Sequence, residues 1–425
     1  MKAERAFRVE RDMTRSNGPA YGWIIVAAGA LMTCVSMGSM FSLAVFLQPI
    51  SVDSGWSRTG ISIAMTISFL AMAVAAFLWG ALSDRFGPRI VVLAGSLLLG
   101  LGLVLASDAS NLVEFQLLFG LFIGAAAGAF YAPMMALASS WFEQNRSLAV
   151  ALVSAGSGVS PVTVAPFARW LIDAYGWRPA MLIVGIAATA LLLPAALLTR
   201  RPPVVLDVAP PAPGVATRAA ALPSRPHLSV AEALRTPQFA ALALAHFACC
   251  VAHSGPLFHM VSFAIGCGIS AMAAVSVYSL AGLSGLGGRL LLGVLADRLG
   301  AKPVLVAGLM VQAIGAGAYV FARQLGELYA LSVVFGIAYG GVMPLYAILA
   351  RDYFGPRILG TVFGAISALA SLGMAFGPWA GGWIFDIQAS YAWLYIGSFA
   401  VGLAAVAVAL TFKPGPVGPQ LAAAD

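Results

Sequence analysis

Twelve long apolar segments constrain the fold of this chain more than any other feature of its sequence. Each is close to or above the ~20 residues that a helix needs to cross a bilayer. Only 9% of the residues are charged, whereas a soluble domain carries about 25%. We therefore expect an all-α membrane protein with twelve transmembrane helices. The expected spans are 21–49, 58–82, 89–107, 112–140, 147–173, 178–199, 237–265, 270–296, 303–323, 327–350, 358–386 and 391–412.

The basic residues between these spans predict how the chain is oriented. An even number of spans places both termini on one side of the membrane. The two tails and the loops on that side hold 18 Lys and Arg residues, whereas the opposite loops hold four. Loops rich in Lys and Arg stay cytoplasmic, so both termini should be cytoplasmic, in a plasma or inner membrane. The net charge of +7 comes from short loops in a lipid-embedded chain and does not indicate nucleic-acid binding.

A proline-rich connection divides the chain into two halves of six spans each. We expect a cytoplasmic tail at 1–20, a six-helix bundle at 21–199, a cytoplasmic linker at 200–236, a second bundle at 237–412 and a tail at 413–425. Near the end of the linker, Ser229-Val-Ala-Glu232 has the capping-box pattern of a short helix.

The two halves repeat a ten-residue loop, at 80–89 after span two and at 293–302 after span eight. Five of its positions are identical and the last is basic in both copies. Each copy contains an Asp-Arg pair, namely Asp84-Arg85 and Asp297-Arg298. Internal duplication of this kind is typical of transporters whose halves move around a central binding site.

Arg289 is the one basic residue placed deep inside an apolar span. No Asp, Glu or Lys lies between Ser270 and Asp297. A guanidinium in hydrocarbon costs several kcal/mol, and arginine does not lose its proton to avoid that cost. Pairing with a buried acid is the structural alternative, but the spans offer no such acid. We therefore predict that Arg289 faces a cavity, where its fork can bind a carboxylate with two hydrogen bonds.

The paired loops, with the pattern G-x-L-[SA]-D-R-x-G-x-[RK], resemble the signature of the major facilitator superfamily. Other motifs are similar to those of the monocarboxylate transporter family and its bacterial relatives, with the oxalate/formate exchangers nearby. These motifs are Tyr21-Gly22-Trp23, Phe142-x-x-x-Arg146-x-Leu148-Ala149 through Ala155-Gly156, Gly176-Trp177-Arg178, Pro256-Leu-Phe-His259, Phe263-Ala264 and Gly268-Ile269-Ser270. The resemblance covers essentially all twelve spans.

The resemblance implies roles for several residues. The family's span-eight arginine binds the substrate carboxylate and falls on Arg289, and its span-seven histidine lies near the substrate and falls on His259. The two Asp-Arg loops correspond to a latch that closes the cytoplasmic side. Two positions depart from the pattern, because Gly285 stands where animal members have an aspartate, and span eleven lacks the lysine of the oxalate exchangers.

Further candidates come from depth and spacing. Tyr131 in span four and Tyr339 in span ten should lie at a depth similar to that of Arg289, so their hydroxyls could bind a substrate oxygen. Four residues of span seven share one helix face, namely His246, Cys249, Cys250 and His253. They could bind a soft metal, but four ligands on one straight helix rarely converge on a tetrahedral ion. We therefore interpret this face as interior packing and expect neither a metal nor a cofactor.

Together these features predict a secondary active transporter of a small monocarboxylate, such as lactate or pyruvate. It should work by alternating access, as a monomer, and be coupled to a proton. An exchanger of oxalate, formate or another organic anion is the near alternative. A receptor on a carrier fold is another, and a membrane enzyme is disfavoured because no Ser-His or HExxH arrangement supports it.

Two routes for the proton remain open. Every acidic residue near the bilayer falls at or close to a span end. His259 could bind the proton, since the reference pKa of histidine lies in the working range. Alternatively, the proton could travel with the substrate held on Arg289.

Overall fold

The computed structural model describes residues 2–142, 145–202, 229–355 and 357–413; in the helices it leaves out the side chains of residues 2–20, 84 and 147. The described part is helical, and twelve of its helical segments are long and apolar enough to cross a membrane. Their bounds lie within a few residues of the predicted spans. The all-α, twelve-span fold is therefore confirmed.

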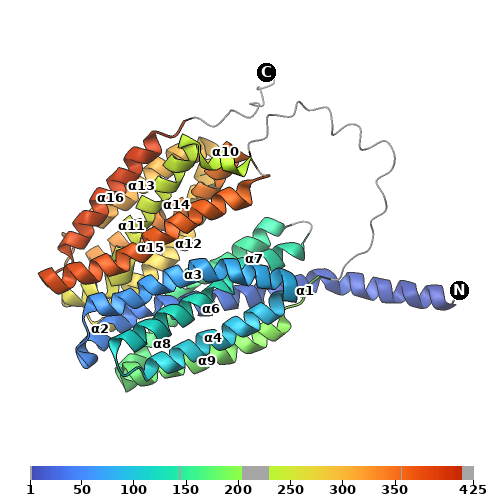
Figure 1. Ribbon diagram of the computed structural model, residues 1–425, viewed down its shortest axis with the longest axis horizontal. Helices are drawn as coiled ribbons and strands as arrows, with labels where there is room; N and C mark the ends of the chain where they lie inside the picture. Colours follow the sequence, from blue (N-terminus) through green and yellow to red (C-terminus); the bar gives the residue numbers. More distant parts are fainter. Residues whose placement is uncertain (1, 143–144, 203–228, 356, 414–425) are drawn as a thin grey trace.

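Figure 1 shows two bundles side by side, joined at one end. The helices of the first are α1 (Lys2–Phe41), α2 (Leu43–Ser54), α3 (Arg58–Phe86), α4 (Pro88–Ser107), α5 (Leu112–Phe115), η1 (Gln116–Ile123), α6 (Gly124–Gly128), α7 (Tyr131–Ser140), α8 (Arg146–Tyr175) and α9 (Trp177–Leu198). After the short α10 (Val230–Leu234), the helices of the second are α11 (Pro237–Gly266), α12 (Ala271–Leu299), α13 (Ala301–Ala318), α14 (Leu325–Phe354), α15 (Leu359–Gln388) and α16 (Ala392–Leu410).

Two of the predicted spans are interrupted, which the sequence analysis did not foresee. In the first, Ser42 separates α1 from α2, and its hydroxyl donates to the carbonyl of Ser39 at 2.7 Å, a local bond that competes with the helical ladder. The fourth span starts as α5, widens into the π-helix η1 and breaks at Ala129–Phe130 before α7. The break lies one turn before Pro133, which has no N–H to donate to the carbonyl of Ala129.

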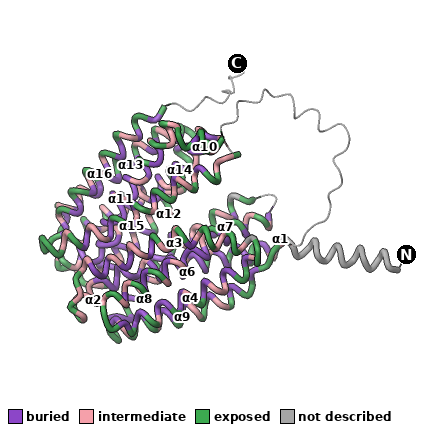
Figure 2. Tube along the Cα trace, viewed as in Figure 1, coloured by how far each residue is buried: buried purple, intermediate pink, exposed green. Residues whose placement is uncertain are grey.

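Lipid chains are as apolar as the outer surface of a helix, so the hydrophobic effect does not drive one helix onto another within a bilayer. Close packing between the helices holds the bundles together instead. Figure 2 shows buried residues along the inner faces and exposed ones along the outer faces. The exposed set includes large apolar side chains such as Phe77, which is 79% exposed. Outer faces of this kind suit contact with lipid chains.

The linker ends as predicted. Ser229 and Glu232 form a reciprocal capping box at the start of α10. Thr236 then accepts the N–H of Phe239 and caps α11, which has Pro237 at its first position. A proline there is already fixed at a helical φ angle and lacks a donor that would be unpaired anyway.

Candidate functional site

Arg289 projects from α12 and is partly buried. Its Nε atom is fully buried and has no hydrogen-bond partner among the described residues. An unpaired buried donor on a charged group costs free energy. The missing partner is thus the first indication of a ligand that the guanidinium could bind.

The phenol of Tyr339 from α14 lies against Gly285, one helical turn before Arg289, and it interacts electrostatically with the guanidinium. The phenol reaches this place because position 285 is a glycine. A Cβ atom on Gly285 would stand 3.2 Å from the Tyr339 Oη and 3.3 Å from the carbonyl oxygen of Gly336, so a larger side chain would displace the phenol. The space beside position 285 is thus occupied by a tyrosine hydroxyl from the neighbouring helix.

Glycines hold α12 and α14 together at this depth. A Cβ on Gly288 would collide with the carbonyl of Ile337, and one on Gly340 would collide with the backbone of Gly285. Backbones in direct contact leave little freedom for either helix to rotate or slide. The guanidinium and the phenol therefore have a fixed spacing.

The interior face of α11 stacks on α14 through two imidazole–phenol pairs. His253 lies against Tyr339 with the ring centroids 5.4 Å apart, and His246 lies against Tyr346 at 4.0 Å. The thiol of Cys249 points instead to Gln312 on α13 at 3.5 Å. Among the described residues, no three of the His, Cys, Asp and Glu side chains are grouped so that they could hold a metal ion.

His259 lies at another place on the same helix. It is fully buried; its Nε2 donates to the carbonyl of Pro378 at 2.9 Å, and its Nδ1 accepts from the Tyr391 hydroxyl at 3.2 Å. That hydroxyl in turn accepts from Arg58 Nη1 at 2.8 Å. No described contact joins His259 to Arg289 or Tyr339, so its predicted role at the substrate site stays a prediction.

The same region contains a clamp between the two halves, which we define as Arg58, Thr59, Asp386 and Tyr391. The Asp386 carboxylate accepts the backbone N–H groups of Arg58 and Thr59, at 3.1 and 2.8 Å, and also the Thr59 hydroxyl. It thereby caps the N-terminus of α3 from the other half. The Arg58 guanidinium lies 3.7 Å above the Phe385 ring, which adds a cation–π contact.

Other contacts extend this closure along the bundles. The Thr66 hydroxyl donates to the carbonyl of Ala375 at 2.7 Å, and the Ser279 hydroxyl donates to that of Pro161. Gly282 packs against the Pro161 ring. The halves are therefore closed together at the end that contains the clamp.

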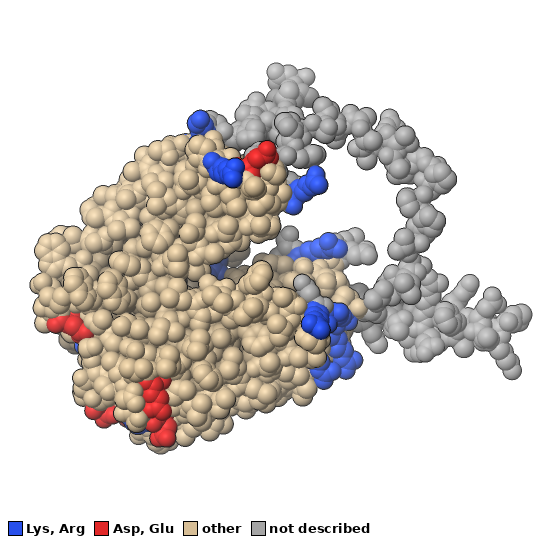
Figure 3. Space-filling model, in the orientation of Figure 1, with Lys and Arg blue, Asp and Glu red and all other residues tan. Residues whose placement is uncertain are grey.

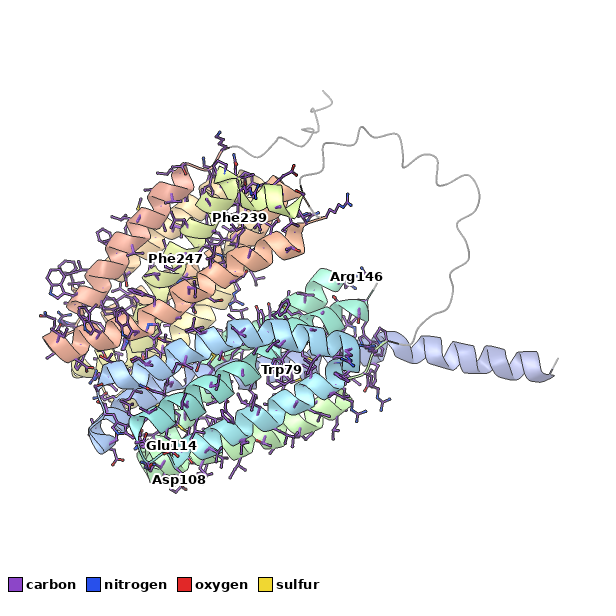
Figure 4. All side chains as sticks on the ribbon, viewed as in Figure 1. Trp79, Asp108, Glu114, Arg146, Phe239 and Phe247 are labelled. Atoms are coloured by element: carbon purple, nitrogen blue, oxygen red, sulfur yellow. The ribbon has the colours of Figure 1, made fainter. Side chains whose placement is uncertain are left out.

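At the opposite end the molecule is open. Figure 3 shows it hollowed between the bundles on the side of the N-terminal helix, with a basic side chain visible inside the hollow. Most basic residues in that view lie on this side, and most acidic ones lie at the clamp end. Figure 4 likewise shows Arg146 at the open end of the first bundle and Asp108 and Glu114 at the other.

The remaining predicted residues are placed less specifically. Tyr131 is the first residue of α7 and is half-buried, with no described bond to Arg289. The side chain of Asp84 lies outside the described residues, whereas Arg85 lies over the Phe86 ring at 5.2 Å. Asp297 and Arg298 are exposed in the last turn of α12. The latch between the two loops stays a prediction.

Sequence reasoning missed two groupings, the pairing of His253 with Tyr339 and the clamp at Asp386. A signal for the first was present. His246 and His253 are seven residues apart, and so are Tyr339 and Tyr346, as two antiparallel helices stacking ring on ring require. The sequence contained no signal for the clamp, because an aspartate close to the end of a span, such as Asp386, cannot be told from a solvated loop charge.

Known proteins are similar to this chain over most of its length. A model of the Major Facilitator Superfamily matches residues 29–326 and 288–424. Human monocarboxylate transporter 11 is 30% identical over 386 residues, covering 86% of this chain and 77% of that protein. Rat monocarboxylate transporter 3 is 28% identical, covering 93% and 81%. The uncharacterized MFS-type transporter YhjX of Escherichia coli (strain K12) is 26% identical, covering 83% and 86%.

Solved structures share the fold. A bacterial homologue of the human lysosomal transporter Spinster, crystallised inward-facing and occupied, superposes with a TM-score of 0.75 at 16% identity, covering 93% of this chain and 99% of that one. A D-xylose–proton symporter gives a TM-score of 0.70 at 17% identity, covering 93% and 98%. The chain therefore belongs to the Major Facilitator Superfamily and, within it, to the monocarboxylate transporter family, and it is a secondary transporter rather than an enzyme.

Proposed function

We propose that this transporter carries a short monocarboxylate across the membrane, with the carboxylate bound by Arg289. The observation that carries the proposal is the buried, unpartnered Nε of that residue. A guanidinium presents two parallel N–H donors that match one carboxylate. Tyr339 stands beside it, and we assign Tyr131 of the first half to the facing wall. A single central cation suits a substrate with a single negative charge.

We also propose that the open end faces the cytoplasm. The excess of Lys and Arg on the termini side supports this orientation. The hollow is then an inward-facing cavity, and the clamp closes the outside. Transport follows when the halves rock, so that the latch loops close the inside while the clamp opens.

The co-transported ion in this proposal is a proton. Binding it would neutralise the charge that enters with the carboxylate and tie uptake to the pH gradient. The described spans contain histidines at depth and acids only near their ends, which favours a histidine as the proton acceptor. An anion exchanger is the second candidate. One arginine can bind one carboxylate without any proton, and this feature of the site favours exchange.

The test is uptake of labelled lactate, pyruvate and formate into proteoliposomes containing the purified protein. We expect accumulation driven by an inward proton gradient. Arg289→Lys should lose most of it, because lysine keeps the charge but lacks the planar fork. Hydrogen bonds to charged groups contribute about 1.5–3 kcal/mol, so KM should rise at least about tenfold. Arg323→Lys, in an exposed loop, is the control and should transport normally.

Three outcomes would contradict parts of this proposal. Normal uptake by Arg289→Lys would remove that residue from the site. Exchange of labelled for unlabelled acid without response to a proton gradient would make the protein an anion exchanger. Binding without any transport would make it a receptor.

A further inference from the structure

We infer that His253, rather than His259, is the residue that binds the coupled proton beside the substrate; the inference rests on the proposed proton-coupled function. On the helices of the second half, Asp297, Glu327, Asp352 and Asp386 each stand third from a helix end, and α11, α13 and α16 contain no acid. A proton bound at the depth of Arg289 therefore needs another acceptor.

Three histidines lie in the described spans, and only one belongs to the substrate site. His253 stacks on Tyr339, the ring that stands next to Arg289. His246 lies two turns away against Tyr346. His259 is engaged at both nitrogens within the second half, by the Pro378 carbonyl and by Tyr391 of the clamp.

The hydrogen bonding of His253 leaves one nitrogen able to take a proton. Its Nδ1 lies 2.8 Å from the carbonyl of Cys249. A carbonyl can only accept, so Nδ1 bears the hydrogen and the neutral ring has its lone pair at Nε2. No described residue donates to that Nε2. Protonation forms one N–H bond there and breaks none within the protein.

The groups around the imidazole suit a proton that arrives with an anion. From α14 it faces Tyr339, with Arg289 and Tyr278 of α12 beyond that ring. Its own helix adds His246 and Cys249. No described acid of α2, α13, α15 or α16 acts on it electrostatically. A proton on His253 adds positive charge on the Tyr339 side of a site that already holds Arg289, and a bound carboxylate offsets that charge, so proton and substrate should bind together.

The experiment separates charge coupling from packing. His253→Asn keeps an amide N–H where Nδ1 donates, but it does not titrate; His253→Gln is a second variant. Each is reconstituted and assayed for lactate accumulation under a one-unit pH gradient, and for exchange of labelled for unlabelled lactate without a gradient. His246→Asn is the matched control, because His246 lies on the same face of α11, two turns away, and stacks on Tyr346 instead of Tyr339.

We expect the wild type and His246→Asn to accumulate lactate up to about tenfold, the limit for one proton per anion at one pH unit. The His253 variants should still exchange labelled for unlabelled lactate, although the rate can fall, and their accumulation ratio under the gradient should drop to about one. Accumulation in either His253 variant that still exchanges overturns the inference, as does equal loss in His246→Asn. Absence of accumulation in the wild type overturns the proton-coupled function instead.

Discussion

The hydroxyl of Tyr339 lies against Gly285, one helical turn from Arg289. Tyr339→Phe should keep the ring stack with His253 and remove one hydrogen bond to the substrate. A bond to a charged partner contributes about 1.5–3 kcal/mol, so we expect KM for the monocarboxylate to rise about tenfold with kcat little changed. Tyr346→Phe is the control, because its hydroxyl donates to the carbonyl of Ala245 within the same half. An equal rise in KM in both variants would argue against a substrate contact.

Single residues differ in how far the sequence alone reveals them. Arg289 was predictable because a charge in an apolar run has few structural explanations. Tyr339 was predicted at the depth of Arg289, but its stacking on His253 was not, since that pairing depends on how two helices are rotated toward each other. Gly285 shows the limit well: the sequence shows an acid missing, and only the structure shows the tyrosine hydroxyl that fills the space.

At the scale of helices, two adjacent glycines of α12 give a matched test of the packing. Gly288 faces the backbone of α14, where a Cβ would collide with Ile337, whereas a Cβ on Gly287 would meet nothing within 4 Å. Gly288→Ala should force the helices apart and lower the thermal unfolding midpoint by several degrees, because overpacking costs about 1–3 kcal/mol. Gly287→Ala should leave it unchanged or raise it slightly, since alanine is the better helix former. Equal midpoints would contradict the close contact.

The helices themselves were largely predictable, and their interruptions were not. Hydropathy and length determine a span to within a few residues because the bilayer sets both. The π-helix η1 depends on tertiary contacts, including the Gln116 amide that donates to the carbonyl of Gly60 at 2.8 Å. The break at Ala129–Phe130 could have been inferred from Pro133, which the sequence analysis treated as part of one continuous span.

At the scale of the whole molecule, the clamp should set the balance between the two open states. Asp386→Asn keeps the shape but loses the charge that caps α3 across the halves. Charge at a helix N-terminus contributes about 0.3–2 kcal/mol, and two-state equilibria respond directly to differences of this size. We expect the outside to open in a larger fraction of molecules.

A distance measurement can check this shift. Spin labels at Val52→Cys and Ile387→Cys, exposed positions at the clamp end of each half, are introduced after the native cysteines are replaced. The distribution in Asp386→Asn should gain a longer component. Asp173→Asn is the control, because its ion pair with Arg169 lies within α8. An unchanged distribution in Asp386→Asn would remove the clamp from the gating mechanism.

The division into two related bundles could be expected from the repeated loops, but the closed end could not. One sequence must support both open states, and these differ by a small free energy distributed over many contacts. Asp386 repeats Asp173 of the first half, in the pattern Trp-x-x-Asp, but Asp173 pairs with Arg169 of its own helix, so the repeat does not indicate a contact between the halves. Asp386 caps a helix 327 residues away in the chain, a distance at which local pattern has no influence.

The glycine contact between α12 and α14 has a consequence for the direction of transport. In the proposed mechanism the two helices that carry Arg289 and Tyr339 move as one body, so the carboxylate would meet the same pair of groups whichever side is open. Its intrinsic affinity then differs between the two faces of the membrane only through what the first half contributes. A carrier built in this way has little preference of its own for import or export. The gradients of acid and proton that a cell maintains would decide whether the transporter imports the substrate as a nutrient or exports it as waste.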